Sequence, residues 1–193
     1  MGFSIELHLD SAVDAAVREL RASLLSAGLR GFELDYEFHP HVTLGYFEEP
    51  PTQAVVDHVH TISSQLERIR FTLSHVGLFP GPATSVVFLG LTPSTALLDA
   101  HRHVQEQMEH LGIPSQSHYR VGNLVPHVTL GEKIPNSEIE RVIGSIKALP
   151  LVTLPCSGIF DRLVVSTDRP ISVNPLSEPR APSVDIRRGI QRN

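Results

Sequence analysis

The hexapeptide Pro-His-Val-Thr-Leu-Gly occurs twice in this chain, at Pro40–Gly45 and at Pro126–Gly131. Six identical residues are improbable as a chance recurrence in 193 residues, so the two copies indicate an internal repeat. Each copy has the alternation of a β-strand, in which side chains two residues apart point to the same face. The histidine and threonine of each copy therefore lie side by side, while its valine and leucine face a core.

The order of the expected elements repeats as well. In each half a strand and a long helix precede the motif strand, and a helix and a further strand follow it. The expected strands are 3–9, 41–47, 70–78, 85–91, 127–132, 151–160 and 162–167, and the expected helices end near 27, 69, 111 and 148. This pattern predicts an α+β fold in which each half is a small sheet backed by helices. We expect residues 1–170 to form a single domain built from these two halves, and residues 171–193 to trail as a mobile tail.

Composition narrows the classes of protein that fit. The chain is 41% hydrophobic and 19% charged, with a formal charge of −5, which argues against a dedicated binder of long nucleic acid. Cys156 is the only cysteine, so no internal disulfide can form, and a reduced cytoplasmic setting is the default. The sequence contains neither a signal-peptide pattern nor an apolar run of membrane-spanning length. We therefore expect a cytoplasmic monomer that does not bind a membrane.

The paired motifs suit chemistry on a phosphate ester. Two histidines on opposite sides of a phosphodiester can divide the work, because a neutral imidazole accepts a proton from water and an imidazolium donates one to the leaving oxygen. The candidates are His41 and His127. Thr43 and Thr129 can donate hydrogen bonds to the non-bridging oxygens and stabilise the charge that builds there. This scheme uses no metal and no other cofactor.

The same residues allow other interpretations. The repeat could be only a duplicated structural unit, or the cleft could bind a nucleotide without turning it over. A metal site is suggested by three His-x-His pairs: His39/His41, His58/His60 and His101/His103. Two of the pairs lie in expected helices, where residues two apart do not share a face, and acidic residues or cysteines are missing at ligand spacing beside them. Surface histidines are the expectation for these pairs.

The motifs resemble those of a known superfamily. His41-Val-Thr43-Leu and His127-Val-Thr129-Leu look like the two His-hydrophobic-Thr/Ser-hydrophobic motifs of the 2H phosphoesterases, and the bacterial 2′-5′ RNA ligase and cyclic nucleotide phosphodiesterase type looks most similar. The resemblance covers roughly residues 2–168. It implies two pseudo-symmetric lobes, each with a small, mainly antiparallel sheet, around a central cleft.

The resemblance also implies an activity. Members of the superfamily typically hydrolyse 2′,3′-cyclic phosphates of nucleotides or RNA ends to 2′-phosphomonoesters without a metal, which makes the chain an RNA-processing type of enzyme. Some members act instead on 2′-5′ linkages, as phosphodiesterase or ligase, or on cyclic phosphates of ADP-ribose. By analogy, His127 is the base and His41 the acid. Many relatives carry a basic residue shortly after the second motif, and here Lys133 is the candidate for that position.

The loop before the second motif offers further substrate contacts. Tyr119 could stack on a base, and Arg120 could pair with a phosphate. Tyr46 follows Thr43 by three residues, so regular alternation places it on the other face of the strand unless a bulge intervenes. The sequence leaves open whether the substrate is a cyclic mononucleotide, an RNA end, a 2′-5′ linkage or an ADP-ribose derivative.

Overall fold

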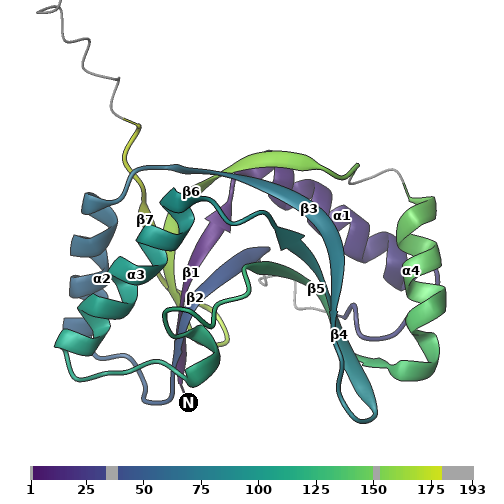
Figure 1. Ribbon diagram of the computed structural model, residues 1–193, viewed down its shortest axis with the longest axis horizontal. Helices are drawn as coiled ribbons and strands as arrows, with labels where there is room; N and C mark the ends of the chain where they lie inside the picture. The colour runs from purple at the N-terminus through teal and green to yellow at the C-terminus, as the bar shows by residue number, and fades with distance from the viewer. Residues whose placement is uncertain (1, 34–38, 150–152, 180–193) are drawn as a thin grey trace, which may run out of the picture.

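The computed structural model describes residues 2–33, 39–149 and 153–179 (Figure 1). In chain order the elements of this part are β1 (Phe3–Leu9), α1 (Ser11–Ser26), β2 (His41–Phe47), α2 (Gln53–Gln65), β3 (Ile69–Phe79), β4 (Thr84–Leu91), α3 (Thr95–His110), η1 (Ser117–Tyr119), β5 (His127–Pro135), η2 (Asn136–Glu138), α4 (Ile139–Ala148), β6 (Cys156–Ser166) and β7 (Pro170–Pro175). The two η elements are short 3₁₀ helices. The predicted α+β class is confirmed. Among the described residues, no helix is both long and apolar enough to cross a membrane.

Local sequence sets where the helices begin and end. The side chains of Asp10, Thr52 and Ser94 accept hydrogen bonds from backbone N–H groups in the first turns of α1, α2 and α3, which would otherwise be unsatisfied. Gly28 and Gly112 follow the ends of α1 and α3 with φ of 74°, a left-handed conformation that glycine adopts without strain. These signals fix α1 and α3, which lie on the two sides of the molecule.

All seven described strands join one antiparallel sheet. The hydrogen-bonded path runs β2-β1-β6-β3-β4-β5, and β7 pairs along β6. Strand β6 connects the two halves, because its beginning pairs with β3 and its end pairs with β1. The two motif strands, β2 and β5, are the ends of this path, and the sheet curves so that they contact each other (Figure 1). The two small sheets expected from the sequence are therefore parts of one continuous sheet.

The helices cross between the halves. Helix α3, from the second half, packs on motif strand β2, while α1, from the first half, packs on motif strand β5. Gln105 of α3 donates a hydrogen bond to the carbonyl of Leu44 at 2.8 Å. On the other side, the buried guanidinium of Arg21 donates to the carbonyl of Thr129, and burial lowers the pKa of Arg21 to about 10, so the side chain stays charged at neutral pH. Each helix also contacts a strand of its own half, α1 with β1 and α3 with β3, so both bridge the two halves.

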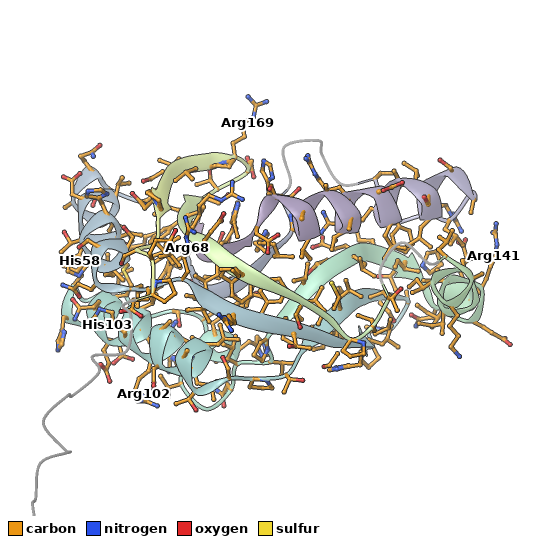
Figure 2. The ribbon with its side chains drawn as sticks, turned by 90° about the horizontal axis from the view of Figure 1, so that it is seen from above. His58, Arg68, Arg102, His103, Arg141 and Arg169 are labelled. Atoms are coloured by element: carbon orange, nitrogen blue, oxygen red, sulfur yellow. The ribbon has the colours of Figure 1, made fainter. Side chains whose placement is uncertain are left out.

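Helices from different halves also lie together at the two ends of the molecule (Figure 2). At one end α1 lies beside α4, where Arg141 donates to the carbonyl of Ala27 at 2.6 Å and so caps the end of α1. At the other end α2 and α3 lie together, and the Nε2 atom of His103 is 2.9 Å from Oε1 of Gln65. Each end thus combines one helix from each half.

The C-terminal part departs from the expected elements. The two strands expected at 151–160 and 162–167 are one strand, β6, within which the backbone continues through Asp161. Residues 170–175 form β7 rather than the start of a tail, and Leu176 is buried in the core. The domain therefore extends beyond residue 170. The remainder of the expected tail, residues 180–193, lies outside the described residues.

Candidate active site

One cavity of about 660 Å³ contains the chemistry-bearing residues of both motifs. It is lined by His41 and Thr43 from β2 and by His127 and Thr129 from β5, which the curvature of the sheet brings together. The valine and leucine of each motif, between 0% and 1% exposed, pack in the core on the opposite face. The alternation read from the hexapeptides thus places all four polar side chains in one cavity.

A bulge at the same position of both motifs shapes the cavity. Opposite β1, Thr43 pairs with Glu6 and Gly45 pairs with Ile5, so Leu44 is an extra residue in β2. Strand β5 has the same register shift at Leu130. A one-residue bulge reverses the alternation that follows it. The next polar side chain of each strand therefore turns into the cavity.

These side chains are Tyr46 on β2 and Glu132 on β5, both three residues after the motif threonine. Tyr46 lines the cavity because a bulge does intervene after Thr43, which the sequence alone could not decide. Glu132, rather than its neighbour Lys133, occupies the corresponding position. Lys133 has a φ of 52° and lines a separate depression with Gly31, Glu33 and Glu132. The residue after the second motif that lines the cavity therefore carries a carboxylate and not the expected basic group.

Backbone carbonyls fix the tautomers of both motif histidines. The Nδ1 atom of His41 is 2.8 Å from the carbonyl of His39, and Nδ1 of His127 is 2.7 Å from the carbonyl of Val125. A carbonyl oxygen can only accept, so each Nδ1 carries the proton. In the neutral form, Nε2 of each ring then bears the lone pair. Two imidazoles held in this way can each exchange a proton at Nε2.

The surroundings of His127 are apolar. The ring of Phe79 lies edge-on to it with a centroid separation of 4.8 Å, and the ring of Phe88 is at 5.1 Å. Burial lowers the pKa of His127; the bond to Val125 opposes this and the charge of His41 adds to it. Because the net pKa is lower than usual, the imidazole of His127 is neutral near pH 7.

The surroundings of His41 are charged. Its Nε2 atom is 3.5 Å from Oε1 of Glu6, a residue of the adjacent strand β1 that is 5% exposed. The same Oε1 accepts a hydrogen bond from the hydroxyl of Ser4 at 2.5 Å, and Oε2 is 2.9 Å from Nε2 of His8. Burial alone would raise the pKa of Glu6, but His41 and the hydrogen bonds from His8 and Ser4 outweigh it and lower the pKa. Glu6 is therefore ionised.

Glu6, His8 and His41 also form a set of possible metal ligands. One donor atom from each lies within 4.8 Å of the others. Two imidazoles with a carboxylate suit several transition metals. No acidic residue stands at ligand spacing beside His41 in the sequence, but Glu6 approaches it from the paired strand β1. In this structure Oε1 of Glu6 accepts a hydrogen bond from Ser4 and Oε2 accepts one from His8, so both carboxylate oxygens have hydrogen-bond donors.

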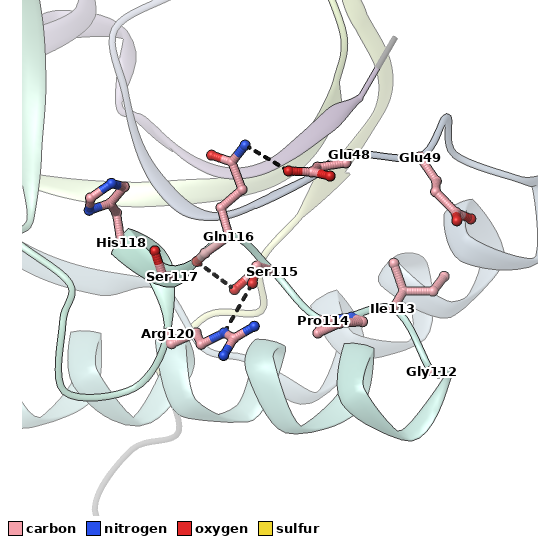
Figure 3. A pocket seen from close by; sticks show the side chains of 10 residues that line it. All are labelled: Glu48, Glu49, Gly112, Ile113, Pro114, Ser115, Gln116, Ser117, His118 and Arg120. Carbon is pink, nitrogen blue, oxygen red and sulfur yellow. Dashed lines mark hydrogen bonds between the residues drawn. The ribbon is translucent and has the colours of Figure 1, made fainter.

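The other predicted substrate contacts fall in different places. Tyr119 lines the cavity, and burial together with the carboxylates of Glu132 and Glu6 raises its pKa, which keeps the phenol protonated. Arg120 lies in a neighbouring pocket of about 590 Å³, where it donates to the carbonyl of Ser115 at 3.2 Å (Figure 3). His118 and Gln116 line both hollows.

Several of the remaining histidines have structural partners, and two of these contacts lie close to the motif strands or the loop before β5. His101 is 2% exposed, and its Nε2 atom lies 2.6 Å from the carbonyl of Tyr119, so the expectation of a surface histidine was wrong there. Because this bond ties α3 to η1, His101 positions the loop that carries Tyr119. His39, which precedes β2, has its Nδ1 atom 2.9 Å from Oδ1 of Asp14 on α1.

Glu6 is a cavity residue that was not predicted from the sequence. A signal for it exists in the alternation of β1, where Ser4, Glu6 and His8 interleave with buried apolar residues. Three polar residues on one face of a strand otherwise made of core residues indicate either a solvated face or a buried polar site. The choice between these depends on the neighbouring strand, which the alternation does not identify.

Comparisons with known proteins agree with this geometry. The family model of the 2′-5′ RNA ligase superfamily matches residues 9–160, a range that includes the strands carrying both motifs. A Bacillus licheniformis protein named as a candidate phosphoesterase is 28% identical over 111 residues. The aligned part is 56% of this chain and 61% of that protein, less than two thirds of its length.

Two solved structures share the fold. The crystal structure of TT0787 from Thermus thermophilus aligns over 93% of this chain and 100% of its own, with a TM-score of 0.62 and 18% identity. Escherichia coli LigT, crystallised with 3′-AMP, aligns over 91% of this chain and 98% of its own, with a TM-score of 0.58 and 15% identity. Taken with the family match over most of the sequence, these observations show that the chain belongs to the 2′-5′ RNA ligase superfamily of 2H phosphoesterases.

Proposed function

We propose that this protein is a metal-independent phosphodiesterase that hydrolyses a 2′,3′-cyclic phosphate, or a related cyclic phosphate, of a nucleotide or RNA end. The observation that carries the proposal is the pairing of two His-x-Thr strands around one cavity, with both imidazoles fixed in the same tautomer. Acid–base catalysis needs two such groups on one substrate, and a site that only binds phosphate does not.

In the proposed reaction, Nε2 of His127 accepts a proton from water as the water oxygen bonds to phosphorus. The bond from phosphorus to the 3′ oxygen breaks, and Nε2 of His41 donates a proton to that oxygen, which leaves a 2′-phosphomonoester. Thr43 and Thr129 donate hydrogen bonds to the non-bridging oxygens as their charge grows. The lowered pKa of His127 supports the role of base, because the ring must be neutral before it can accept the proton.

The small size of the cavity supports a substrate of one or two nucleosides. LigT, which shares the fold, has been crystallised with 3′-AMP and with NADP⁺. Incubating the protein with a panel of substrates and identifying the products tests the proposal. The panel comprises 2′,3′-cyclic mononucleotides, an RNA ending in a 2′,3′-cyclic phosphate, a 2′-5′-linked dinucleotide and a cyclic phosphate of ADP-ribose. Conversion of a cyclic phosphate to a 2′-phosphomonoester supports it, whereas turnover of the 2′-5′ linkage alone replaces it with the alternative activity, and binding without turnover leaves only a nucleotide-binding module.

We expect the rate to follow a bell-shaped pH profile and to be insensitive to chelator. The low-pH limb reports protonation of the base, and since the pKa of His127 is lowered, activity should persist below the usual histidine value of about 6.5. The high-pH limb reports loss of the acid proton. Measuring kcat/KM between pH 5 and 9 on one cyclic nucleotide, with and without EDTA, checks both expectations. Loss of activity in EDTA and its return with zinc or manganese would contradict the metal-free mechanism.

Replacing the motif threonines should slow the reaction without unfolding the protein. Thr43→Val and Thr129→Val keep the β-branched shape and remove the hydroxyl donor, so each is expected to lower kcat by about 10- to 100-fold, below the loss for a main oxyanion donor. Both side chains are half-buried at the cavity wall, so we expect little change in the melting temperature. Steady-state kinetics and thermal unfolding check this, and destabilisation with unchanged kcat would mean that the hydroxyls are structural.

A further inference from the structure

A second pocket adjoins the active-site cavity, and the proposed reaction does not use it. Its volume of about 590 Å³ is close to the 660 Å³ of the cavity. Gln116 and His118 line both hollows, so a ligand can extend from one into the other along these two side chains. In the proposed reaction the cavity holds the cyclic phosphate with its nucleoside, and the pocket is a space of similar size beside it.

We propose that this pocket is a subsite for the nucleotide that precedes the cyclic phosphate in an RNA chain, and that Arg120 binds the phosphodiester joining the two nucleotides. The inference rests on the proposed function for the reaction, whereas binding at the subsite is a property that can be measured without turnover. It makes an oligoribonucleotide end, rather than a free cyclic mononucleotide, the preferred substrate.

The guanidinium of Arg120 is oriented and still has donors available. Its Nε atom donates to the carbonyl of Ser115 at 3.2 Å, which fixes the plane of the group. Its two terminal nitrogens have no hydrogen-bond or ion-pair partner among the described residues, and the residue is exposed where it lines the pocket. Two parallel N–H groups of a guanidinium match two oxygens of a phosphate. Arg120 is therefore suited to bind a phosphodiester here.

The pocket has an order that suits a nucleotide. Arg120 and His118 lie at one side of it, and Glu49 and Ile113 lie at the other (Figure 3). The phosphodiester is therefore expected beside Arg120, next to the side chain of His118 that also lines the cavity. The sugar and base then extend toward Ile113 and Pro114, whose apolar surfaces a base can contact.

The carboxylates of the pocket lie where a nucleoside, and not its phosphate, is expected. Glu49 is on the side away from Arg120 (Figure 3). Glu48 lies between the two sides, and its Oε1 atom accepts a hydrogen bond from Nε2 of Gln116 at 3.4 Å. A carboxylate can accept hydrogen bonds from ribose hydroxyls or from a base amino group, so these two residues favour a nucleoside in this part of the pocket.

The loop that forms the pocket is anchored at several points. Gly112 follows α3 with a φ of 74°, and the buried hydroxyl of Ser115 donates to Oε1 of Gln105 on α3 at 2.5 Å. The backbone N–H of Gln116 donates to the carbonyl of Tyr46 on β2 at 2.9 Å. Because these bonds tie the loop to α3 and to a motif strand, the pocket keeps its position relative to the catalytic residues, and binding requires little reordering.

The other side of the cavity is less suited to a second phosphate. None of the described residues that line the cavity is a lysine or an arginine. Lys133 lines a depression that shares only Glu132 with the cavity, among the described residues. A phosphodiester that left the cavity on that side would pass a carboxylate, which repels it. One that left toward Arg120 passes Gln116 and His118, both of which can donate hydrogen bonds.

Steady-state kinetics with two substrates test the subsite. They are adenosine 2′,3′-cyclic phosphate and the dinucleotide ApA ending in a 2′,3′-cyclic phosphate, each in the presence of EDTA. The measured quantity is kcat/KM for the dinucleotide divided by kcat/KM for the mononucleotide, a ratio that does not depend on the amount of folded protein. We expect a ratio of about 10 in the wild-type protein and a fall of about 5- to 10-fold in Arg120→Gln, which loses the charged donor.

Arg102→Gln is the matched control. Arg102 is on α3, pairs with Asp99 at 3.1 Å and lines neither hollow. The substitution removes an equal charge from the surface, so the ratio should stay within about twofold of the wild-type value. An equal fall in Arg102→Gln would show that net charge, and not the subsite, sets the preference.

A change in the substrate gives the second measurement. In an analogue of the dinucleotide the internal phosphate is replaced by an uncharged methylphosphonate, and the wild-type protein should lose most of its preference for it. Arg120→Gln should add no further loss with this analogue, because the two changes remove the same interaction. Should Arg120→Gln not fold, the analogue decides on the wild-type protein alone, and an undiminished preference without the charge would refute the proposal.

The remaining outcomes separate the subsite from the reaction. A wild-type ratio of about 1, or a ratio that Arg120→Gln leaves unchanged, would overturn the subsite while the turnover of cyclic phosphates stands. Calorimetric titration with 2′-AMP and with ApA carrying a terminal 2′-phosphate measures binding without turnover. A protein that hydrolyses neither substrate, but binds the dinucleotide about tenfold more tightly in a manner that depends on Arg120, would refute the proposed function alone.

Discussion

His41→Asn and His127→Asn are each expected to lower kcat by at least 100-fold on any accepted cyclic phosphate, the lower end for a lost acid or base. Asparagine has an amide that can still donate to the carbonyls of His39 and Val125, so the substitution removes the proton exchange at Nε2 with little disturbance of the strand ends. The double variant should be little slower than either single variant, because the two rings act in one step.

His103→Asn is the control for these variants. It replaces a histidine on α3 that contacts Gln65 on α2 and not the cavity. Its kcat should remain near that of the wild-type protein, and circular dichroism should show the same fold for the wild type and all four variants. Near-full activity of either motif variant on every accepted substrate would show that the paired histidines are not the catalytic groups.

The leucines of the motifs should matter for stability as the histidines matter for rate. Leu44 and Leu130 are fully buried on the core face, directly beside the cavity-facing threonines. Leu44→Ala or Leu130→Ala should lower the free energy of unfolding by about 2 to 5 kcal/mol, through lost burial and the void that remains. For a chain of this length that corresponds to a fall in melting temperature of about 4 to 20 °C.

Thermal and urea unfolding measure this effect, and Thr129→Val, one residue from Leu130, is the matched comparison. The two substitutions test the alternation itself, since they change neighbouring residues that face opposite sides. Equal melting temperatures for Leu130→Ala and Thr129→Val would contradict the assignment of one face to the core and the other to the cavity.

Patterns within single elements were the part of the fold that the sequence could predict. The alternation of β1, β2 and β4, the capping residues at Asp10 and Ser94, and the glycines after α1 and α3 all act over a few residues, and the elements form where these signals placed them. The catalytic candidates were identified for the same reason. Histidine and threonine two apart on a strand share a face whatever surrounds the strand.

Features that depend on the partner of a strand were missed. The bulges at Leu44 and Leu130 are defined only against β1 and β4, and they decide that Tyr46 and Glu132, rather than Lys133, line the cavity. Glu6 becomes a neighbour of His41 only when β1 pairs with β2. Such pairing is not encoded in the local alternation.

Loops and chain ends were harder to predict. Arg120 follows Tyr119 directly, yet it lines the neighbouring pocket while Tyr119 lines the cavity, and its contact with a phosphate stays a prediction. Residues from 171 onward were predicted as tail because the apolar periodicity stops at Pro170. The pairing of β7 with β6 and the burial of Leu176, the residue after β7, show that the fold continues without that periodicity.

The crossing of α1 and α3 has the form of a domain swap within one chain. In a half-length protein with one motif, the buried leucine of the motif strand would be uncovered. A helix from a second copy would then have to pack on that strand. Such a pair would be a symmetric dimer, in which both histidines have identical neighbours and neither is committed to being acid or base. Joining the copies in one chain removes that constraint. One imidazole can then acquire a carboxylate while the other acquires two aromatic rings, with both motifs unchanged.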